Sequence, residues 1–232
     1  YGNVISLGAN TFQDCTALEE FTYANSKFNG GRVGLTQFIT SQLFYNDYCL
    51  SKVNLPSAVS VIGSKSFMNC GVQGSVFDFS NTNIEVIQDS AFSGCRSNIV
   101  LPDTVTTIGG SAFSNCYTQT INLSSNLTSL VSSAFKGSKL KSVDLSSTSI
   151  TAINDSVFQG CLDLESVVLP KNCTYIGSRA FYGCTSLTDV TMNGEITKIS
   201  QRAFYDDTAL ESFDFPSSLT SIQDYAFYNT GI

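Results

Sequence analysis

The sequence contains no histidine and no tryptophan. Without histidine, the Ser-His-Asp and Cys-His arrangements of nucleophilic hydrolases cannot form. The cysteines include no CxxC pair, so a zinc site is not indicated, and no glycine-rich phosphate-binding motif is present. We therefore expect a protein that is not an enzyme and that uses no cofactor and no metal. Adjacent acids, Asp206/Asp207 and Glu19/Glu20, leave a glycosidase as a distant alternative, although neighbours in sequence seldom converge on one substrate.

Charge is scarce as well. Charged residues make up 13% of the chain, about half the share that is usual in soluble proteins. The net charge is −7, and Lys and Arg form no cluster, so neither nucleic acid nor an anionic membrane surface is an expected partner. No apolar run reaches the roughly 20 residues of a spanning helix, so no membrane insertion is expected within this segment. A surface of hydroxyls and amides is more typical of secreted or surface-displayed proteins.

A phenylalanine recurs through the chain at intervals close to 23 residues. Five residues before each copy stands an aliphatic residue, which is Ile in eight copies and Leu in two. Self-similarity at this period is the signature of stacked repeats. The ten phenylalanines are Phe12, Phe44, Phe67, Phe92, Phe113, Phe135, Phe158, Phe181, Phe204 and Phe227.

Each copy continues into a short alternation of apolar and polar residues, which predicts a strand with one buried face. One copy cannot bury its own apolar side, but stacked copies can, with the Phe, Ile and Leu positions forming ladders through a shared interior. We expect residues 1–232 to form a single solenoid of about ten rungs, one rung for each copy. The clearest strand segments are 120–124, 142–146, 166–170, 189–193 and 212–216.

Three copies depart from the regular length. The copy that begins at Phe67 has two extra residues, within CGVQGSVFDFSNTNIEVI (70–87). The interval from Phe12 to Phe44 contains extra residues around FNGGRVG (28–34), whose glycines predict a protruding loop near residues 24–34. The copy that begins at Phe92 is two residues short. Such changes are as often tolerated insertions or deletions as functional ones.

The stretch SVFQGCLDLESVVLPKNCTYIGSRAFYGCTSL (156–187) matches the pattern aliphatic-x4-Phe-x2-Cys-x2-Leu-x2-Val-x-Leu-Pro-x2-Val almost position for position, with Cys173 in place of the final Val. It resembles the repeats of the BspA-like leucine-rich-repeat family, and the resemblance covers essentially the whole chain. The resemblance implies a right-handed leucine-rich-repeat horseshoe of the strand-dominated α/β class, with short parallel strands joined by turns or short 3-10 segments. It also implies secretion or display on the cell surface, and adhesion to host proteins or to other cells.

Six of the eight cysteines occupy one position, three residues after the repeat Phe. Other copies have Asp47, Ser138, Asp207 and Thr230 there, so this is interpreted as a turn position for small residues with a weak polar group. Stacked rungs would bring the pairs 70–95, 95–116 and 161–184 within the Cα range of a disulfide. Parallel side chains suit a bridge poorly, however, and free thiols are expected. The six cysteines are Cys15, Cys70, Cys95, Cys116, Cys161 and Cys184.

If the chain binds a partner, the outward side of the strands is the expected surface. In each strand the residue between two buried ones points away from the core. A column of acids and amides there could contact an extended protein, or a glycan through hydrogen bonds; ordinary solvated strand residues are the alternative. The candidate partner-binding residues are Asn54, Asp78, Asn122, Asp144, Thr191 and Asp214.

Both ends of the chain interrupt a copy, so we expect an excised segment of a longer protein; oligomerisation through uncapped ends is the alternative. The leading functional hypothesis is an extracellular or cell-surface adhesion module that binds a protein or glycan on a host or neighbouring cell. The rival hypothesis is an intracellular scaffold or regulatory interaction repeat, because free thiols persist inside the cell.

Overall fold

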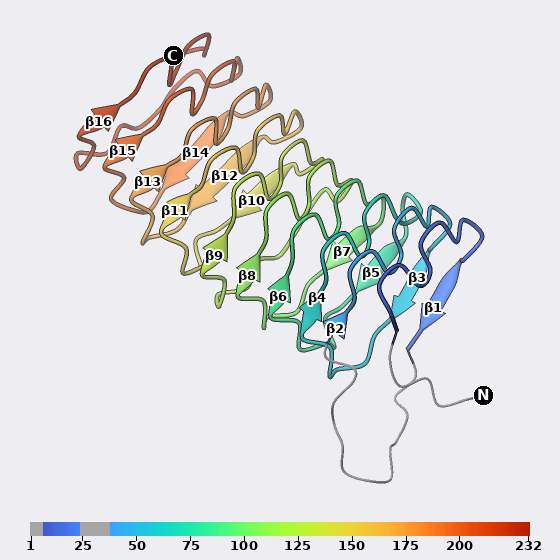
Figure 1. The fold of residues 1–232 in the computed structure, drawn as a ribbon. Helices are drawn as coiled ribbons and strands as arrows, with labels where there is room; N and C mark the ends of the chain where they lie inside the picture. Colours follow the sequence, from blue (N-terminus) through green and yellow to red (C-terminus); the bar gives the residue numbers. More distant parts are fainter. Residues whose placement is uncertain (1–6, 24–37) are drawn as a thin grey trace, which may run out of the picture.

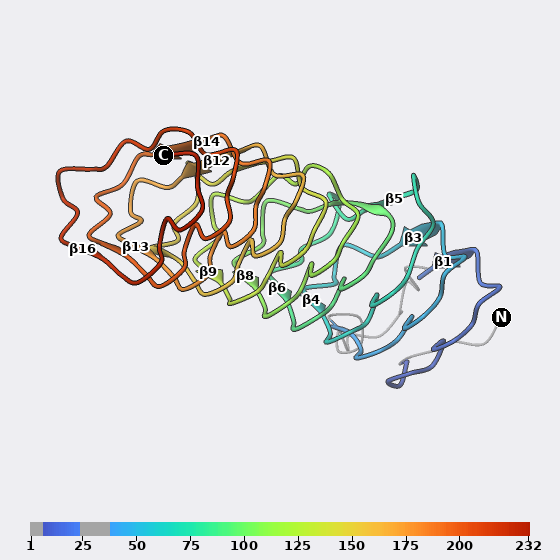
Figure 2. The same cartoon turned by 90° about the horizontal axis from the view of Figure 1, so that it is seen from above.

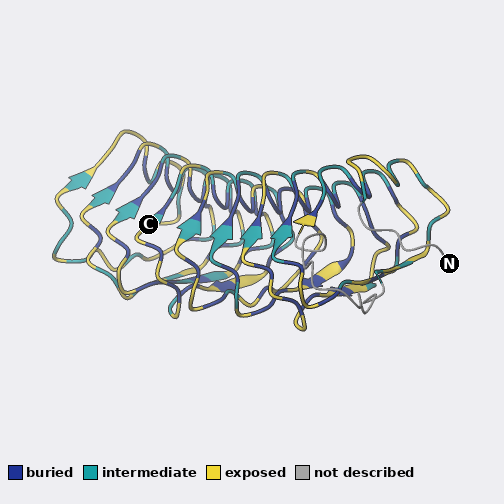
Figure 3. Ribbon diagram, turned by 60° about the horizontal axis from the view of Figure 1, so that its bottom comes forward, coloured by how far each residue is buried: buried dark blue, intermediate teal, exposed yellow. Residues whose placement is uncertain are grey.

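The computed structural model describes residues 7–23 and 38–232, which form one stack of turns with parallel strands (Figure 1). The loop predicted near residues 24–34 lies outside the described residues. Within the described ranges the strands are joined by turns and no helix occurs, so none could cross a membrane. Seen from above, the rungs follow one another as offset outlines (Figure 2), and the row is gently curved (Figure 3).

The strands form two columns along the stack (Figure 1). Each strand pairs in parallel with the equivalent strand of a neighbouring rung. The short-strand column contains β2 (Phe38–Ile39), β4 (Val61–Ile62), β6 (Val86–Ile87), β8 (Thr107–Ile108), β9 (Ser129–Leu130), β11 (Ala152–Ile153), β13 (Tyr175–Ile176), β15 (Lys198–Ile199) and β16 (Ser221–Ile222). The long-strand column contains β1 (Glu20–Thr22), β3 (Lys52–Asn54), β5 (Val76–Asp78), β7 (Asn98–Val100), β10 (Ser142–Asp144), β12 (Ser166–Leu169) and β14 (Asp189–Met192).

The predicted Ile and Phe ladders are both present. In the short-strand column the aliphatic residues pair in register, as Ile153 does with Ile176 and Ile176 with Ile199. Between the columns, each repeat phenylalanine stacks on the next, with ring centroids 5.0 to 5.8 Å apart and interplanar angles of 4° to 25°. The eight rings from Phe44 to Phe204 are fully buried. Near-parallel stacking at this distance is the favourable offset geometry for aromatic pairs.

The number of complete rungs is smaller than predicted. A rung runs from one phenylalanine to the next, so ten copies enclose nine intervals, and the interval from Phe12 to Phe44 includes residues outside the described ranges. The solenoid has about eight turns, which are those between Phe44 and Phe227. The repeat itself is confirmed, because all ten rings belong to one stack.

The segment around each phenylalanine has a fixed hydrogen-bond pattern. The N–H of Phe67 donates to the carbonyl of Ala91 in the next rung at 2.8 Å, whereas the N–H of the following residue, Met68, bonds back to Lys65 within the same turn at 3.2 Å. The residues two before and two after the phenylalanine have positive φ, such as 58° at Ser156 and 71° at Gly160. This alternation lets every second amide bond between rungs while the others close the turn.

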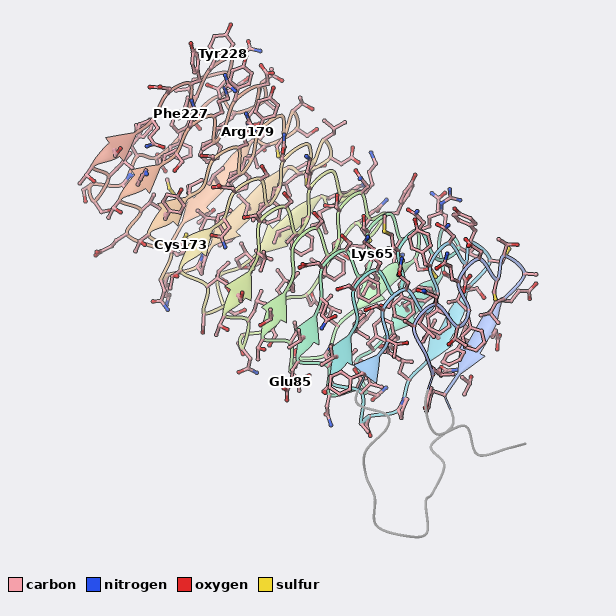
Figure 4. All side chains as sticks on the ribbon, viewed as in Figure 1. Lys65, Glu85, Cys173, Arg179, Phe227 and Tyr228 are labelled. Carbon is pink, nitrogen blue, oxygen red and sulfur yellow. The ribbon has the colours of Figure 1, made fainter. Side chains whose placement is uncertain are left out.

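Left-handed residues therefore occur twice in every rung. The position two residues after the phenylalanine holds Asn, Asp or Gly, which tolerate this conformation. The position two residues before the phenylalanine holds less suitable residues, including Lys65 and Arg179, which lie on the same side of the stack (Figure 4). Isolated backbone strain often marks a functional site, but strain that recurs in every rung belongs to the architecture.

Two predicted strands are wrong. No strand forms in 120–124 or in 212–216. In the first case the hydroxyl of Thr118 accepts the N–H of Ile99 at 3.3 Å and donates to the carbonyl of Thr120, so a side chain takes the place of a ladder bond between rungs. In the second case the segment lies beside β14 in the last described rung, and no feature of the structure explains the loss of the strand.

Candidate functional site

The six candidate residues are all exposed. Three of them, Asn54, Asp78 and Asp144, end strands of the long-strand column, and Thr191 lies within β14. The register places Asp144 beside Val168 and Val168 beside Thr191, so this part of the predicted outward column exists. Asn122 and Asp214 lie in the two segments without a strand. The long-strand column consists of three sheets, with one break between β3 and β5 and another between β7 and β10, where Asn122 lies.

Two of the candidate acids already have structural partners. Asp78 accepts the N–H of Ser80 at 2.9 Å, and Asp144 accepts the N–H of Ser146 at 2.8 Å. These are the bonds of Asx turns, in which an aspartate holds the backbone two residues further on. The hydrogen bonds with Ser80 and with Ser146 lower the pKa values of Asp78 and Asp144 below the usual range. Both acids therefore end a strand as well as presenting negative charge.

The column also contains bonds between side chains. The amide of Asn54 donates to the hydroxyl of Thr22 in the neighbouring strand at 2.9 Å. The hydroxyl of Thr191 donates to Asp189 two residues earlier at 3.4 Å. These bonds orient the exposed groups, and they lie at the surface where a partner could reach them.

The cysteine position is structural. The eight cysteines are unpaired thiols, and five of the six ladder cysteines are fully buried. The thiols of Cys161 and Cys184 donate to carbonyls of Phe135 and Phe158 in the preceding rungs, each at 3.1 Å. Burial raises the pKa of Cys161 to about 11 and that of Cys184 well above the ordinary thiol value. A buried thiol that stays protonated is a poor nucleophile.

Two aspartates share that buried position. Asp47 and Asp207 are inaccessible to solvent. Burial raises the pKa of Asp47 to about 7 and that of Asp207 to about 9. Both lie in the turn after a repeat phenylalanine, and the described residues contain no group of three or more His, Cys, Asp or Glu side chains that could hold a metal ion. The raised pKa values of these two aspartates therefore affect the stability of the fold. The sequence pattern did not reveal this effect.

A second surface was missed by the sequence analysis. A hollow of about 370 Å³ opens beside the first residues of the long-strand column, where β7 begins. Its lining is polar and aromatic and comes from five successive rungs. The lining residues are Gln73, Gly74, Arg96, Asn98, Tyr117, Gln119, Lys139 and Asp163.

Comparison with known proteins identifies the repeat. A family model described as "BspA type Leucine rich repeat region (6 copies)" matches residues 2–97, 37–148, 72–175 and 130–232. Curated protein sequences give no match.

Solved structures share the architecture. The pneumococcal vaccine antigen PcpA aligns with a TM-score of 0.52 and 22% identity over 98% of this chain and 67% of that one. A leucine-rich repeat protein from Eubacterium ventriosum ATCC 27560 aligns with a TM-score of 0.50 and 19% identity over 87% of this chain and 82% of that one. A leucine rich cell surface protein from Faecalibacterium prausnitzii A2-165 aligns with a TM-score of 0.48 and 23% identity over 98% of this chain and 76% of that one. With the family match spanning almost the entire sequence, the chain belongs to the BspA-type leucine-rich-repeat family.

Proposed function

We propose that this chain is a non-catalytic binding module, secreted or displayed on a cell surface, that holds a protein or glycan partner on the outward side of the long-strand column. The observation that carries the proposal is the exposed polar column at Asn54, Asp78, Asp144 and Thr191, set on a continuous buried core. Adhesion to a host or neighbouring cell is the role that such a module would serve.

The scaffold suits recognition because it is rigid and periodic. Parallel strands place equivalent side chains about 4.8 Å apart, so a partner that extends along the stack meets polar groups at multiples of this spacing, with Val100 and Val168 between them. The Phe and Ile ladders fix that spacing from within. Strand-face groups on a rigid element bind with less loss of conformational entropy than groups on loops.

The composition supports an extracellular location. Only 13% of residues are charged, and Ser, Thr and Asn supply most of the surface polarity. The pneumococcal structure with the same fold is described as a vaccine antigen, a description that suits a protein exposed to the host. Immunogold labelling of thin sections of the source organism tests this part, since label confined to the cytoplasm would contradict it.

The binding surface is tested with two variants. The first combines Asp78→Asn, Asp144→Asn and Asp214→Asn, because asparagine keeps the Asx-turn acceptor while removing the charge. The second combines Asn54→Arg, Asn122→Arg and Thr191→Arg, which adds bulk along the column. Glu85→Gln, Glu195→Gln and Asp224→Asn form the control, because these exposed acids lie outside the long-strand column; Glu85 immediately precedes β6 (Figure 4).

Capture is measured against immobilised extracellular-matrix proteins and a glycan array. Each column variant is expected to weaken capture by about tenfold or more, the effect of losing interactions at the centre of an interface. The control should bind as the parent chain does. Equal capture by the parent and both column variants, all folded, would reject this surface.

A further inference from the structure

The hollow beside β7 arises from unequal connector lengths between the buried ladder residue and the long strand. Five residues (71–75) link Cys70 to β5, and four (162–165) link Cys161 to β12. Between them the path is shorter, with two residues (96–97) from Cys95 to β7 and three (139–141) from Ser138 to β10. Short connectors flanked by longer ones leave a depression, and its volume of about 370 Å³ falls in the usual range for small-ligand sites, roughly 300 to 1,000 Å³.

The hollow is positively charged although the chain as a whole is acidic. Its lining contains two basic residues, Arg96 and Lys139, and one acidic residue, Asp163. Lys139 pairs with Asp163 at 3.4 Å, and this pair is half exposed and therefore weak. The other ion pair of the described residues joins Lys52 and Glu20, so Arg96 has no carboxylate partner there.

Arg96 is held in place by an aromatic ring. Its guanidinium lies 5.8 Å from the centre of the Tyr48 ring, a cation–π distance that restricts the side chain without neutralising it. A positioned guanidinium without a counter-ion is suited to a planar carboxylate, which it can bind through two hydrogen bonds.

Three amide side chains of the hollow are also free to bind a ligand. Across the described ranges, the side chains of Gln73, Asn98 and Gln119 make no hydrogen bond to the protein. This distinguishes them from Asp78 and Asp144, whose carboxylates hold their own turns. Three free amides offer both donors and acceptors, which is the requirement for binding hydroxyl groups.

Tyr117 adds an apolar surface to these groups. Its side chain is 42% exposed, and no other ring within the described part of the chain stacks on it, unlike Tyr182 and Tyr205, whose faces meet at 5.0 Å. A free ring face can pack against the C–H face of a pyranose, whereas a stacked ladder presents edges.

We propose that this hollow binds an acidic sugar of the uronic acid type, with its carboxylate on Arg96, its hydroxyls on the amides of Gln73, Asn98 and Gln119, and its ring on Tyr117. The combination of one unpaired cation, several amides and one open aromatic face fits a carboxylated ring better than a phosphate, which needs no aromatic contact. The inference goes beyond the polar column and holds even if that column is inert, because the two surfaces share no proposed residue.

The test uses trigalacturonate as the probe and isothermal titration calorimetry as the measurement, on the full chain. Arg96→Gln is expected to weaken binding by about tenfold or more, the usual effect of removing a charge-assisted hydrogen bond. Tyr117→Ala should weaken binding as well. Lys198→Gln is the matched control, since Lys198 also lies over a tyrosine ring, at 5.5 Å from Tyr175, but in the short-strand column. The control should bind as the parent chain does, and added salt should weaken binding by the parent more than binding by Arg96→Gln.

The methyl ester of trigalacturonate and hexaglutamate complete the experiment. The proposal expects the ester to bind about tenfold more weakly than the free acid, and hexaglutamate to bind more weakly than the sugar. No binding of trigalacturonate, equal binding of its ester, or an equal affinity of Arg96→Gln would overturn the proposal. Tighter binding of hexaglutamate, lost in Arg96→Gln, would assign the hollow to an acidic peptide instead.

Discussion

One carboxylate oxygen of Asp207 accepts the backbone N–H of Cys184 at 2.7 Å, and the other oxygen is buried without a partner among the described residues. In the two preceding rungs the equivalent side chain is a thiol that donates to a carbonyl. An ionised carboxylate cannot donate, so an acid at this position is compatible with the ladder chiefly when it carries a proton. This agrees with burial raising the pKa of Asp207 to about 9.

Stability should therefore fall as the pH rises. The ordinary pKa of the carboxyl is 3.8 and its folded pKa is about 9, so the folded state binds the proton more tightly across that interval. The stabilisation is complete below the lower value and is lost as the pH rises through the higher one. We expect the urea midpoint, followed by tyrosine fluorescence, to decrease from pH 5 to pH 9. Asp47, with its pKa raised to about 7, should act in the same direction.

Two variants isolate the contribution of Asp207. Asp207→Cys restores the common ladder residue, and Asp207→Asn removes the titration. Both should be more stable than the parent chain at pH 8 and should show a flatter dependence on pH. Asp224→Asn is the control, because Asp224 is exposed, and it should retain the parent slope. An unchanged slope in both Asp207 variants would show that this acid is ionised in the folded chain.

Loss of one ring from the phenylalanine ladder should be severe. Phe158 is fully buried, and its ring lies 5.7 Å from Phe135 and 5.4 Å from Phe181. Phe158→Ala should reduce the free energy of unfolding by about 3–5 kcal/mol through cavity formation. Phe38→Ala is the comparison, because Phe38 is 61% exposed, and it should change stability by no more than about 0.5 kcal/mol. Similar losses for the two would mean that the ladder is not the main source of stability.

The sequence predicts the repeat because burial enforces it. A side chain that must stack on its own copy cannot change type freely, so the spacing of Ile153, Phe158 and Leu164 remains visible in the residues. The strand expected at 120–124 followed the same logic and was wrong, because the hydroxyl of Thr118 competes for the N–H of Ile99. Alternation records which side chains face the core, and it contains no information about such a competing bond.

The hollow and the left-handed turns were harder to predict. The hollow depends on differences between connectors, whose lengths of five, two, three and four residues after Cys70, Cys95, Ser138 and Cys161 are visible in the sequence once the strand starts are known. Asn and Gly two residues after the phenylalanine were a signal for positive φ. The position two residues before it has Ser156 and Arg179 among its members, which do not indicate that conformation.

Gly160 allows the turn conformation to be tested without steric interference. Its φ is 71°, and an added Cβ would meet nothing within 4 Å. Gly160→Ala should therefore destabilise the chain by about 1–2 kcal/mol, the cost of a left-handed residue with a Cβ. Gly160→Asn should cost less, since Asn69 and Asn115 occupy this position in other rungs with φ of 55° and 53°. Urea unfolding measures both, and equal effects of Ala and Asn would contradict the conformational explanation.

Thiol reactivity should follow burial rather than position in the sequence. Cys49 is exposed, whereas Cys70, Cys95 and Cys184 are inaccessible to solvent and burial raises the pKa of Cys184 well above the ordinary value. Because the thiolate is the reactive form, an aromatic disulfide reagent at pH 8 should modify Cys49 promptly in the folded chain. Cys15 is half-buried and should follow more slowly, and the other six should react after denaturant is added. Cys49→Ser should remove the prompt phase alone, and rapid modification of the ladder thiols in folded Cys49→Ser would mean that the rungs open far more readily than the stacked core allows.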